Sequence, residues 1–189
     1  ETEYALRQSE SGTLVFHDAF LGKVDALGML RAICPELDGA APGALRSRAL
    51  PDLRHVICLS LGTPRNLVDF DAVAEGDQEW LARLPDVRRG VDPSDPMNII
   101  YTSGTTGFPK GGLSLHRNNL ASIWCLSERM GLTHEHRSLC NLPLFSNFGC
   151  MFVAALSFLR GATVVLHEAF EPLEAFRTIA GEGITHLYG

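Results

Sequence analysis

The chain has no block of basic residues and no apolar run long enough to span a bilayer, and each absence excludes a class of function. Its 16 Lys and Arg residues are outnumbered by 22 Asp and Glu residues, so the net charge is −6. A nucleic-acid partner would need a concentrated positive surface and is therefore not expected. The longest apolar run, Gly149–Leu159, is too short for a transmembrane helix.

The cysteines and histidines also lack the spacing of a metal site. The five cysteines are widely separated and contain no CxxC pair, which favours buried free thiols in a reducing cytoplasm over disulfides or bound zinc. His134 and His136 flank Glu135, but a structural zinc site needs four ligands, so a solvated loop is the simpler interpretation. The cysteines are Cys34, Cys58, Cys125, Cys140 and Cys150.

Composition and periodicity predict a globular α/β protein. The chain is 46% hydrophobic and 20% charged, and its 189 residues are enough to bury a sizeable core. Apolar β-rich runs alternate with helical patterns, which indicates a layered, largely parallel sheet with flanking helices. Near-continuous apolar runs such as TVVL indicate strands buried on both faces. Strands are expected at 12–17, 53–60, 98–102, 138–142, 162–167 and 184–188, and helices at 21–33, 118–130, 148–159 and 172–180.

Two stretches have weaker patterns. Residues 38–51 are small and contain Pro and Gly, which predicts a surface loop or a short irregular helix. Residues 69–96 are polar and rich in Asp and Pro, which predicts a connector and not a domain boundary, with a solvated acidic face on its helical part. Within this connector, Trp80 and Leu81 are expected to pack inward.

The most informative motif is IIYTSGTTGFPKGG, residues 99–112. A short strand runs into six small residues, a combination that no regular element tolerates. Gly104 and Gly107 can adopt positive φ, so that backbone N–H groups and four hydroxyls converge on an anion. Pro109 stiffens the exit, and Lys110 supplies a flexible positive charge. The motif therefore predicts a polyphosphate loop at the end of a sheet strand.

The spacing excludes one kind of phosphate loop and leaves one alternative open. A Walker A loop requires GxxxxGK[ST], whereas Phe108 and Pro109 separate Gly107 from Lys110 here, and Gly111 follows the lysine. The alternative is a solvated Ser/Thr/Gly turn between two strands, which composition alone does not reject.

The sequence YTSGTTGFPKGG resembles the phosphate-binding signature of the adenylate-forming (AMP-binding) superfamily, most closely that of acyl-CoA synthetases. The resemblance continues through LSLHRNNLAS and LPLFSNFGCMFVAALSFLRGATVVL. It implies ATP-dependent activation of a carboxylic acid, most simply a fatty acid, to an acyl adenylate and then to a coenzyme A thioester, with Mg²⁺ as cofactor. The residues that it implies for the β- and γ-phosphates are Thr102, Ser103, Gly104, Thr105, Thr106, Gly107 and Lys110.

The same resemblance assigns the segment LPLFSNFG to part of the acyl pocket. Phe145, Ser146, Asn147 and Gly149 are the expected lining residues. Many relatives have a histidine directly after PLF, whereas this chain has Ser146, so the contact with the substrate carboxylate differs here. The alternative is a packed strand-to-helix corner in which Gly149 permits close approach of the backbone.

The resemblance also implies that residues 1–189 are one fragment of an amino-terminal domain, because the family's adenine, magnesium and catalytic-lysine segments lie beyond it. No catalytic residue is assigned, and the fragment alone is expected to be inactive. Its expected partners are a small carboxylate substrate and the remaining part of its parent chain. Two alternatives stay open, namely an amino-acid adenylation fragment and a non-catalytic nucleotide- or partner-binding module.

Overall fold

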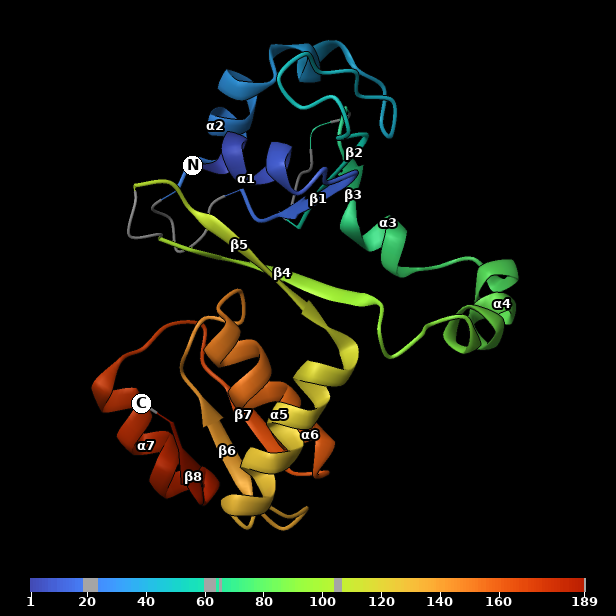
Figure 1. Ribbon diagram of the computed structural model, residues 1–189. Coiled ribbons are helices and arrows are strands. Elements are labelled where there is room, and N and C mark those ends of the chain that lie inside the picture. Colours follow the sequence, from blue (N-terminus) through green and yellow to red (C-terminus); the bar gives the residue numbers. More distant parts are fainter. Residues whose placement is uncertain (19–23, 60–63, 65, 104–106, 189) are drawn as a thin grey trace. The chain divides into compact units, whose positions relative to one another are not determined.

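The computed structural model describes residues 1–18, 24–59, 64, 66–103 and 107–188 (Figure 1). The chain forms two compact units, one made of Glu1–Val91 with Tyr101–Gly111 and the other of Asp92–Ile100 with Gly112–Gly189. The boundary at Val91 falls inside the stretch that was expected to be a connector and not a domain boundary, so this expectation is wrong. Both units mix helices with parallel strands, which confirms the predicted α/β class.

The first unit is built on a three-stranded parallel sheet in the order β1-β2-β3. In its register Thr13 lies opposite His55 and Ile57 opposite Val68. The sheet packs on α2 and a 3₁₀ turn, and seven of the ten buried residues described in this core are leucines. The elements are α1 (Thr2–Gln8), β1 (Thr13–Phe16), α2 (Ala26–Ile33), η2 (Pro35–Gly39), β2 (His55–Cys58), β3 (Val68–Asp69), α3 (Phe70–Ala74) and α4 (Gln78–Arg89).

The helix expected at 21–33 begins later than its apolar pattern indicates. Helix α2 begins at Ala26 because the Asp25 carboxylate accepts a hydrogen bond from the Gly28 N–H at 2.7 Å, which caps the first turn. Residues 19–23 lie outside the described residues. The start of this helix is therefore set by a local polar contact and not by the first apolar residue of the pattern.

The stretch at 38–51 is part of the core and not only a surface loop. Leu45 and Leu50 are 1% and 2% exposed and pack with the leucines of α2 and the turn after it. The buried Ser47 hydroxyl accepts a hydrogen bond from the Leu50 N–H, so the irregular backbone is satisfied without a helix. The irregular segment thus supplies apolar anchors that periodicity does not reveal.

The connector contains two helices, and the expectation that Trp80 and Leu81 pack inward is wrong. Helices α3 and α4 bury no residue, and the Trp80 and Leu81 side chains are 59% and 52% exposed. Arg83 lies 4.3 Å from the centre of the Trp80 ring, which is a cation–π contact within the helix itself. The helical pattern is therefore present without a described partner for its apolar side.

The second unit has a parallel sheet in the order β7-β6-β8. Arg137 lies opposite Thr163, and Ser138 lies opposite both Val164 and His186. Its elements, together with the two strands shared between the units, are β4 (Pro96–Thr102), β5 (Lys110–Leu115), α5 (His116–Arg129), β6 (Arg137–Cys140), η3 (Phe148–Ala155), α6 (Leu156–Leu159), β7 (Thr163–Leu166), α7 (Pro172–Glu182) and β8 (His186–Leu187).

Burial of TVVL on both faces is not observed among the described residues. Strand β7 pairs with β6 alone, and Leu166 is 56% exposed. Strand β8 is equally an edge strand, with Leu187 58% exposed, so the strand expected at 184–188 is shorter and less buried than predicted. Only β6, which lies between them, is buried along most of its length. An apolar strand composition identifies a strand but not its place in the sheet.

The helix expected at 148–159 is present but changes its winding. Its first part, η3, is a π-helix, and its last turn, α6, is α-helical. Together with α5 it encloses a core that includes Ile123, Leu132 and Met151. Among the cysteines, which are all free, Cys34, Cys58 and Cys140 are buried as expected, whereas Cys125 and Cys150 are exposed.

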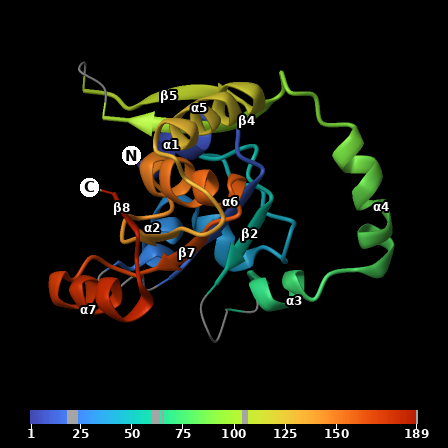
Figure 2. The same ribbon diagram turned by 90° about the horizontal axis from the view of Figure 1, so that it is seen from below.

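The apolar side of α7 does not face a described core. Leu173 and Phe176 are 56% and 72% exposed, whereas Ala175 is buried. Pro172 opens the helix and Gly183, at φ +62°, ends it before the chain turns into β8 (Figure 2). Local signals thus set where this helix begins and ends, but they do not determine whether its large side chains are buried.

Candidate phosphate loop and acyl corner

The candidate phosphate loop connects β4 to β5, which form a separate two-stranded sheet. It therefore does not follow a strand of either parallel sheet, contrary to the expectation from α/β folds. Thr102, Ser103, Gly107 and Lys110 are all exposed, and Gly107 adopts φ +90° as the motif predicts. Gly104, Thr105 and Thr106 lie outside the described residues.

The loop stems carry donors and one positive charge. Lys110 begins β5, and its ammonium group forms no ion pair with any residue that the structure describes. On the opposite stem, Thr102 ends β4 and Ser103 follows it, and both residues are exposed. A Cβ added to Gly107 would meet no described atom within 4 Å, so the glycine serves backbone conformation and not packing. Such an arrangement leaves donors available for an anion.

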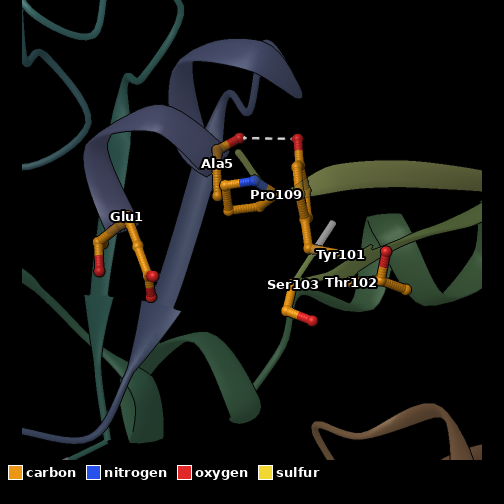
Figure 3. Close-up of a pocket in the computed structure, with 7 residues that line it drawn as sticks. Glu1, Ala5, Tyr101, Thr102, Ser103 and Pro109 are labelled. Atoms are coloured by element: carbon orange, nitrogen blue, oxygen red, sulfur yellow. Dashed lines mark hydrogen bonds between the residues drawn. The ribbon is translucent and has the colours of Figure 1, made fainter. Parts of the chain in front are cut away.

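A hollow of about 430 Å³ lies between α1 and the base of the stems (Figure 3). Neither Gly107 nor Lys110 is among its described lining residues, and Glu1 adds a carboxylate there, so the hollow itself is a poor phosphate site. It separates the stems from α1. The described lining residues are Glu1, Thr2, Ala5, Tyr101, Thr102, Ser103 and Pro109.

Two contacts connect the stems to α1. On the incoming stem, the Tyr101 hydroxyl donates a hydrogen bond to the Ala5 carbonyl at 3.2 Å, as Figure 3 shows. On the outgoing stem, the Phe108 ring lies with its centre 6.1 Å from that of Tyr4. The sequence pattern predicted only that Tyr101 lies in a strand, and not that its hydroxyl forms this contact. A contact between residues separated by 96 positions leaves no signal in one sequence.

The LPLFSNFG segment forms a tight corner held by its own polar groups. The Ser146 hydroxyl donates to the Pro143 carbonyl at 2.7 Å and accepts from the Gly149 N–H at 3.1 Å. A Cβ at Gly149 would lie 2.4 Å from the Pro143 carbonyl oxygen, which only glycine avoids. Ser146 and Gly149 thus have structural partners within the corner.

Phe145 and Asn147 lie in the same corner, one with an exposed ring and the other with a buried amide oxygen. The Phe145 side chain is 83% exposed. Asn147 precedes η3, and its Oδ1 atom is buried without a hydrogen-bond partner among the described residues. An unsatisfied buried acceptor is costly, and it points to a donor that this part of the chain does not supply. The acyl-pocket assignment of these residues remains a prediction.

Two histidines of the second unit, His136 and His186, contact each other and neighbouring hydroxyls. The rings of His136 and His186 meet edge-on at 4.6 Å, and the His136 Nδ1 atom accepts from the Thr133 N–H. Burial, and then the nearby His136, lower the pKa of His186 below its ordinary value. The described residues contain no group of three or more His, Cys, Asp or Glu side chains arranged to hold a metal ion.

The family of AMP-binding enzymes matches residues 1–189. Medium-chain acyl-CoA ligase ACSF2, mitochondrial, from Bos taurus is 35% identical over 195 residues, which cover 100% of this chain and 32% of that protein. The putative acyl-CoA synthetase YngI of Bacillus subtilis is 30% identical, with 100% of this chain and 34% of that protein covered. The chain thus spans about a third of the length of these curated relatives.

Solved structures agree on the fold. A putative long-chain-fatty-acid CoA ligase from Rhodopseudomonas palustris superposes with a TM-score of 0.71 at 18% identity, covering 98% of this chain and 40% of that one. The anthranilate CoA ligase AuaEII, solved with anthranoyl-AMP, superposes with a TM-score of 0.73 at 22% identity, covering 100% of this chain and 32% of that one. Across the described residues, no helix has the length and apolar character that a membrane span requires. Because the family match extends over every residue, the chain belongs to the AMP-binding enzyme family.

Proposed function

We propose that this chain supplies the pyrophosphate-holding loop of an acid–thiol ligase, which activates a carboxylic acid with ATP and transfers the acyl group to coenzyme A. The observation that carries the proposal is the pair of exposed stems, with Thr102 and Ser103 on one and Gly107 and Lys110 on the other. It is supported by membership of the AMP-binding enzyme family.

The chemistry explains why a loop of donors is useful. The substrate carboxylate attacks the α-phosphorus of ATP, the bond to the bridging oxygen breaks, and pyrophosphate leaves with the developing negative charge. The thiol of coenzyme A then attacks the acyl carbon and AMP departs. Groups that stabilise charge on pyrophosphate lower the barrier of the first step. We assign this role to Lys110 with the loop hydroxyls, and we assign no general base.

The described residues fit the phosphates better than they fit a metal ion. Hydroxyls, backbone N–H groups near a glycine with positive φ and one ammonium group are phosphate ligands. These residues would hold the phosphates, and a bound Mg²⁺ would supply charge neutralisation there. Gly104, Thr105 and Thr106 belong to the same proposal, although they lie outside the described residues.

A medium-chain fatty acid is the first substrate to test. The relatives named as medium-chain ligases motivate this choice, and Phe145 and Asn147 are the proposed contacts from this chain. Ser146 and Gly149 are proposed as the frame of the pocket, because both already serve the corner. The cytoplasmic location expected from the cysteines stays a prediction, since several relatives are named as mitochondrial.

The test has a binding arm and an activity arm. Titration of the 189-residue chain with pyrophosphate and with ATP should show saturable binding that Lys110→Ala weakens. ATP–pyrophosphate exchange should then be measured on the full-length protein with fatty, aryl and amino acids. Exchange with fatty acids alone supports the proposal, and exchange with amino acids alone favours amino-acid adenylation. Binding without exchange favours a non-catalytic nucleotide module.

A further inference from the structure

The two stems of the candidate loop both reach the same short helix. Tyr101 lies directly before the loop and hydrogen-bonds to Ala5, while Phe108 lies directly after Gly107 and contacts Tyr4. Ala5 and Tyr4 are consecutive residues near the middle of α1. One turn of one helix therefore contacts both sides of a loop that is about a hundred residues away in sequence.

Among the described residues, a hollow borders the base of the stems. The hollow lined by Glu1, Thr2, Ala5 and Tyr101 separates α1 from Thr102 and Ser103 (Figure 3). Phe108 is 70% exposed, so its ring contact with Tyr4 is made at the surface and not inside a core. A stem that borders an open hollow depends strongly on the individual contacts that cross it.

We infer that Tyr101 and Tyr4 are positioning residues, which hold the stems of the phosphate loop on α1 so that Thr102, Ser103 and Lys110 face one anion. The inference rests on the proposed function, because it names residues that act on the same loop. Neither tyrosine needs to touch the phosphate. Each tyrosine restricts the stems before the ligand arrives, so that less conformational entropy is lost on binding.

The main test is Tyr101→Phe, which removes one hydroxyl and retains the ring. Loss of a neutral hydrogen bond should weaken pyrophosphate binding about fivefold, which corresponds to about 1 kcal/mol. The matched control is Tyr188→Phe, which removes a hydroxyl from the second unit, where it lies 3.4 Å from Ser138 Oγ. This control should leave the affinity unchanged.

The outgoing stem is tested separately through Tyr4. Tyr4→Leu removes the ring that Phe108 contacts and should weaken pyrophosphate binding about two- to fivefold, whereas Tyr4→Phe keeps the ring and should restore the affinity. A residue that serves global stability alone would lower the unfolding midpoint and leave the affinity of the folded protein unaltered. That result for both Tyr101→Phe and Tyr4→Leu would overturn the inference.

A measurement without ligand separates this inference from the proposed function. Trypsin cleaves after Lys110 when the stem opens, and cleavage after Arg177 in the second unit is an internal reference. Tyr101→Phe should raise the Lys110 rate about fivefold and leave the Arg177 rate unchanged. If the unsubstituted chain does not bind pyrophosphate but the cleavage rates change as stated, the proposed function fails, whereas the role of the tyrosines in holding the stems is supported. If binding occurs but neither affinity nor rates respond, the anchoring fails alone.

Discussion

The two candidate functional segments use their polar groups in opposite ways. At the phosphate loop, the described hydroxyls and Lys110 are exposed, and a Cβ added to Gly107 would meet no described atom within 4 Å. At the acyl corner, the Ser146 hydroxyl makes two hydrogen bonds within the segment, and Gly149 is pressed against Pro143. The described polar groups of the loop are exposed to solvent, whereas the Ser146 hydroxyl of the corner is bonded to the corner's own backbone.

This difference shows how similar residue types acquire different roles. Serine and glycine occur in both segments, and composition alone would give them the same phosphate- or substrate-binding interpretation. A hydroxyl that already has a donor and an acceptor gains little from a ligand, while an exposed hydroxyl exchanges water for the ligand. The comparison therefore predicts that substitutions in the loop change affinity and that substitutions in the corner change stability.

The largest expected effect is that of Lys110→Ala. Hydrogen bonds to charged groups contribute roughly 1.5–3 kcal/mol, so pyrophosphate affinity should fall about 10- to 100-fold. Isothermal titration on the chain and the variant measures this change. The control is Arg177→Ala, which removes the same charge from an exposed site in the second unit. An equal loss for both variants would show that only net charge matters.

The two glycines provide the sharpest test of the comparison. Gly149→Ala places a Cβ 2.4 Å from a backbone oxygen, and the overpacking should lower the free energy of unfolding of the second unit by about 1–3 kcal/mol. Gly107→Ala meets no described atom but strains a backbone at φ +90°, which costs about 1 kcal/mol and should mainly reduce pyrophosphate affinity. Urea unfolding and ligand titration on both variants separate the effects. Equal changes in stability and in affinity for the two variants would contradict the comparison.

Ser146→Ala should destabilise the second unit by about 1 kcal/mol, because two hydrogen bonds of the corner are lost. Thermal unfolding measures this loss. Ser122→Ala is the matched control, since the Ser122 hydroxyl makes a single exposed bond to Asn118 within a helix. A fall in carboxylate affinity of the full-length protein with unchanged stability would instead place Ser146 in the substrate pocket.

The smallest effect is a pH dependence of the second unit. Burial and His136 lower the pKa of His186 below 6.5 in the folded state, so the unfolded state binds the proton more readily. The stability contribution is complete above pH 6.5 and should be lost as the pH falls below that value. The groups facing His186 are the His136 ring, the Thr185 hydroxyl and the Met130 carbonyl, with the Arg137–Glu182 ion pair nearby.

Unfolding midpoints measured between pH 7.5 and pH 5 should therefore show a weaker decline in His186→Gln than in the parent chain. His134→Gln, which changes an exposed histidine two residues before His136, should retain the decline. If the unfolding midpoint declined equally with pH in the unsubstituted chain and in both variants, groups other than His186 would cause the acid sensitivity.

Much of the fold was predictable, because the relevant signals are local. The alternation of apolar runs predicted the α/β class and parallel pairing, and the strand expected at 138–142 is β6. Capping carboxylates such as those of Asp25 and Glu171 begin helices through contacts three residues away, although the expected start at residue 21 missed the cap at Asp25. The motif ending in Lys110 predicted a loop with a left-handed glycine, which Gly107 confirms.

The tertiary structure alone decided which side chains are buried and which polar groups remain available. Leu45 and Leu50 enter a core from an irregular segment, whereas Trp80 and Phe176 stay exposed on regular helices. The pairing of Tyr101 with Ala5 likewise joins residues far apart in sequence. Helices, turns and caps depend on neighbours along the chain, so one sequence determines them. Burial depends on partners that only the folded chain brings together.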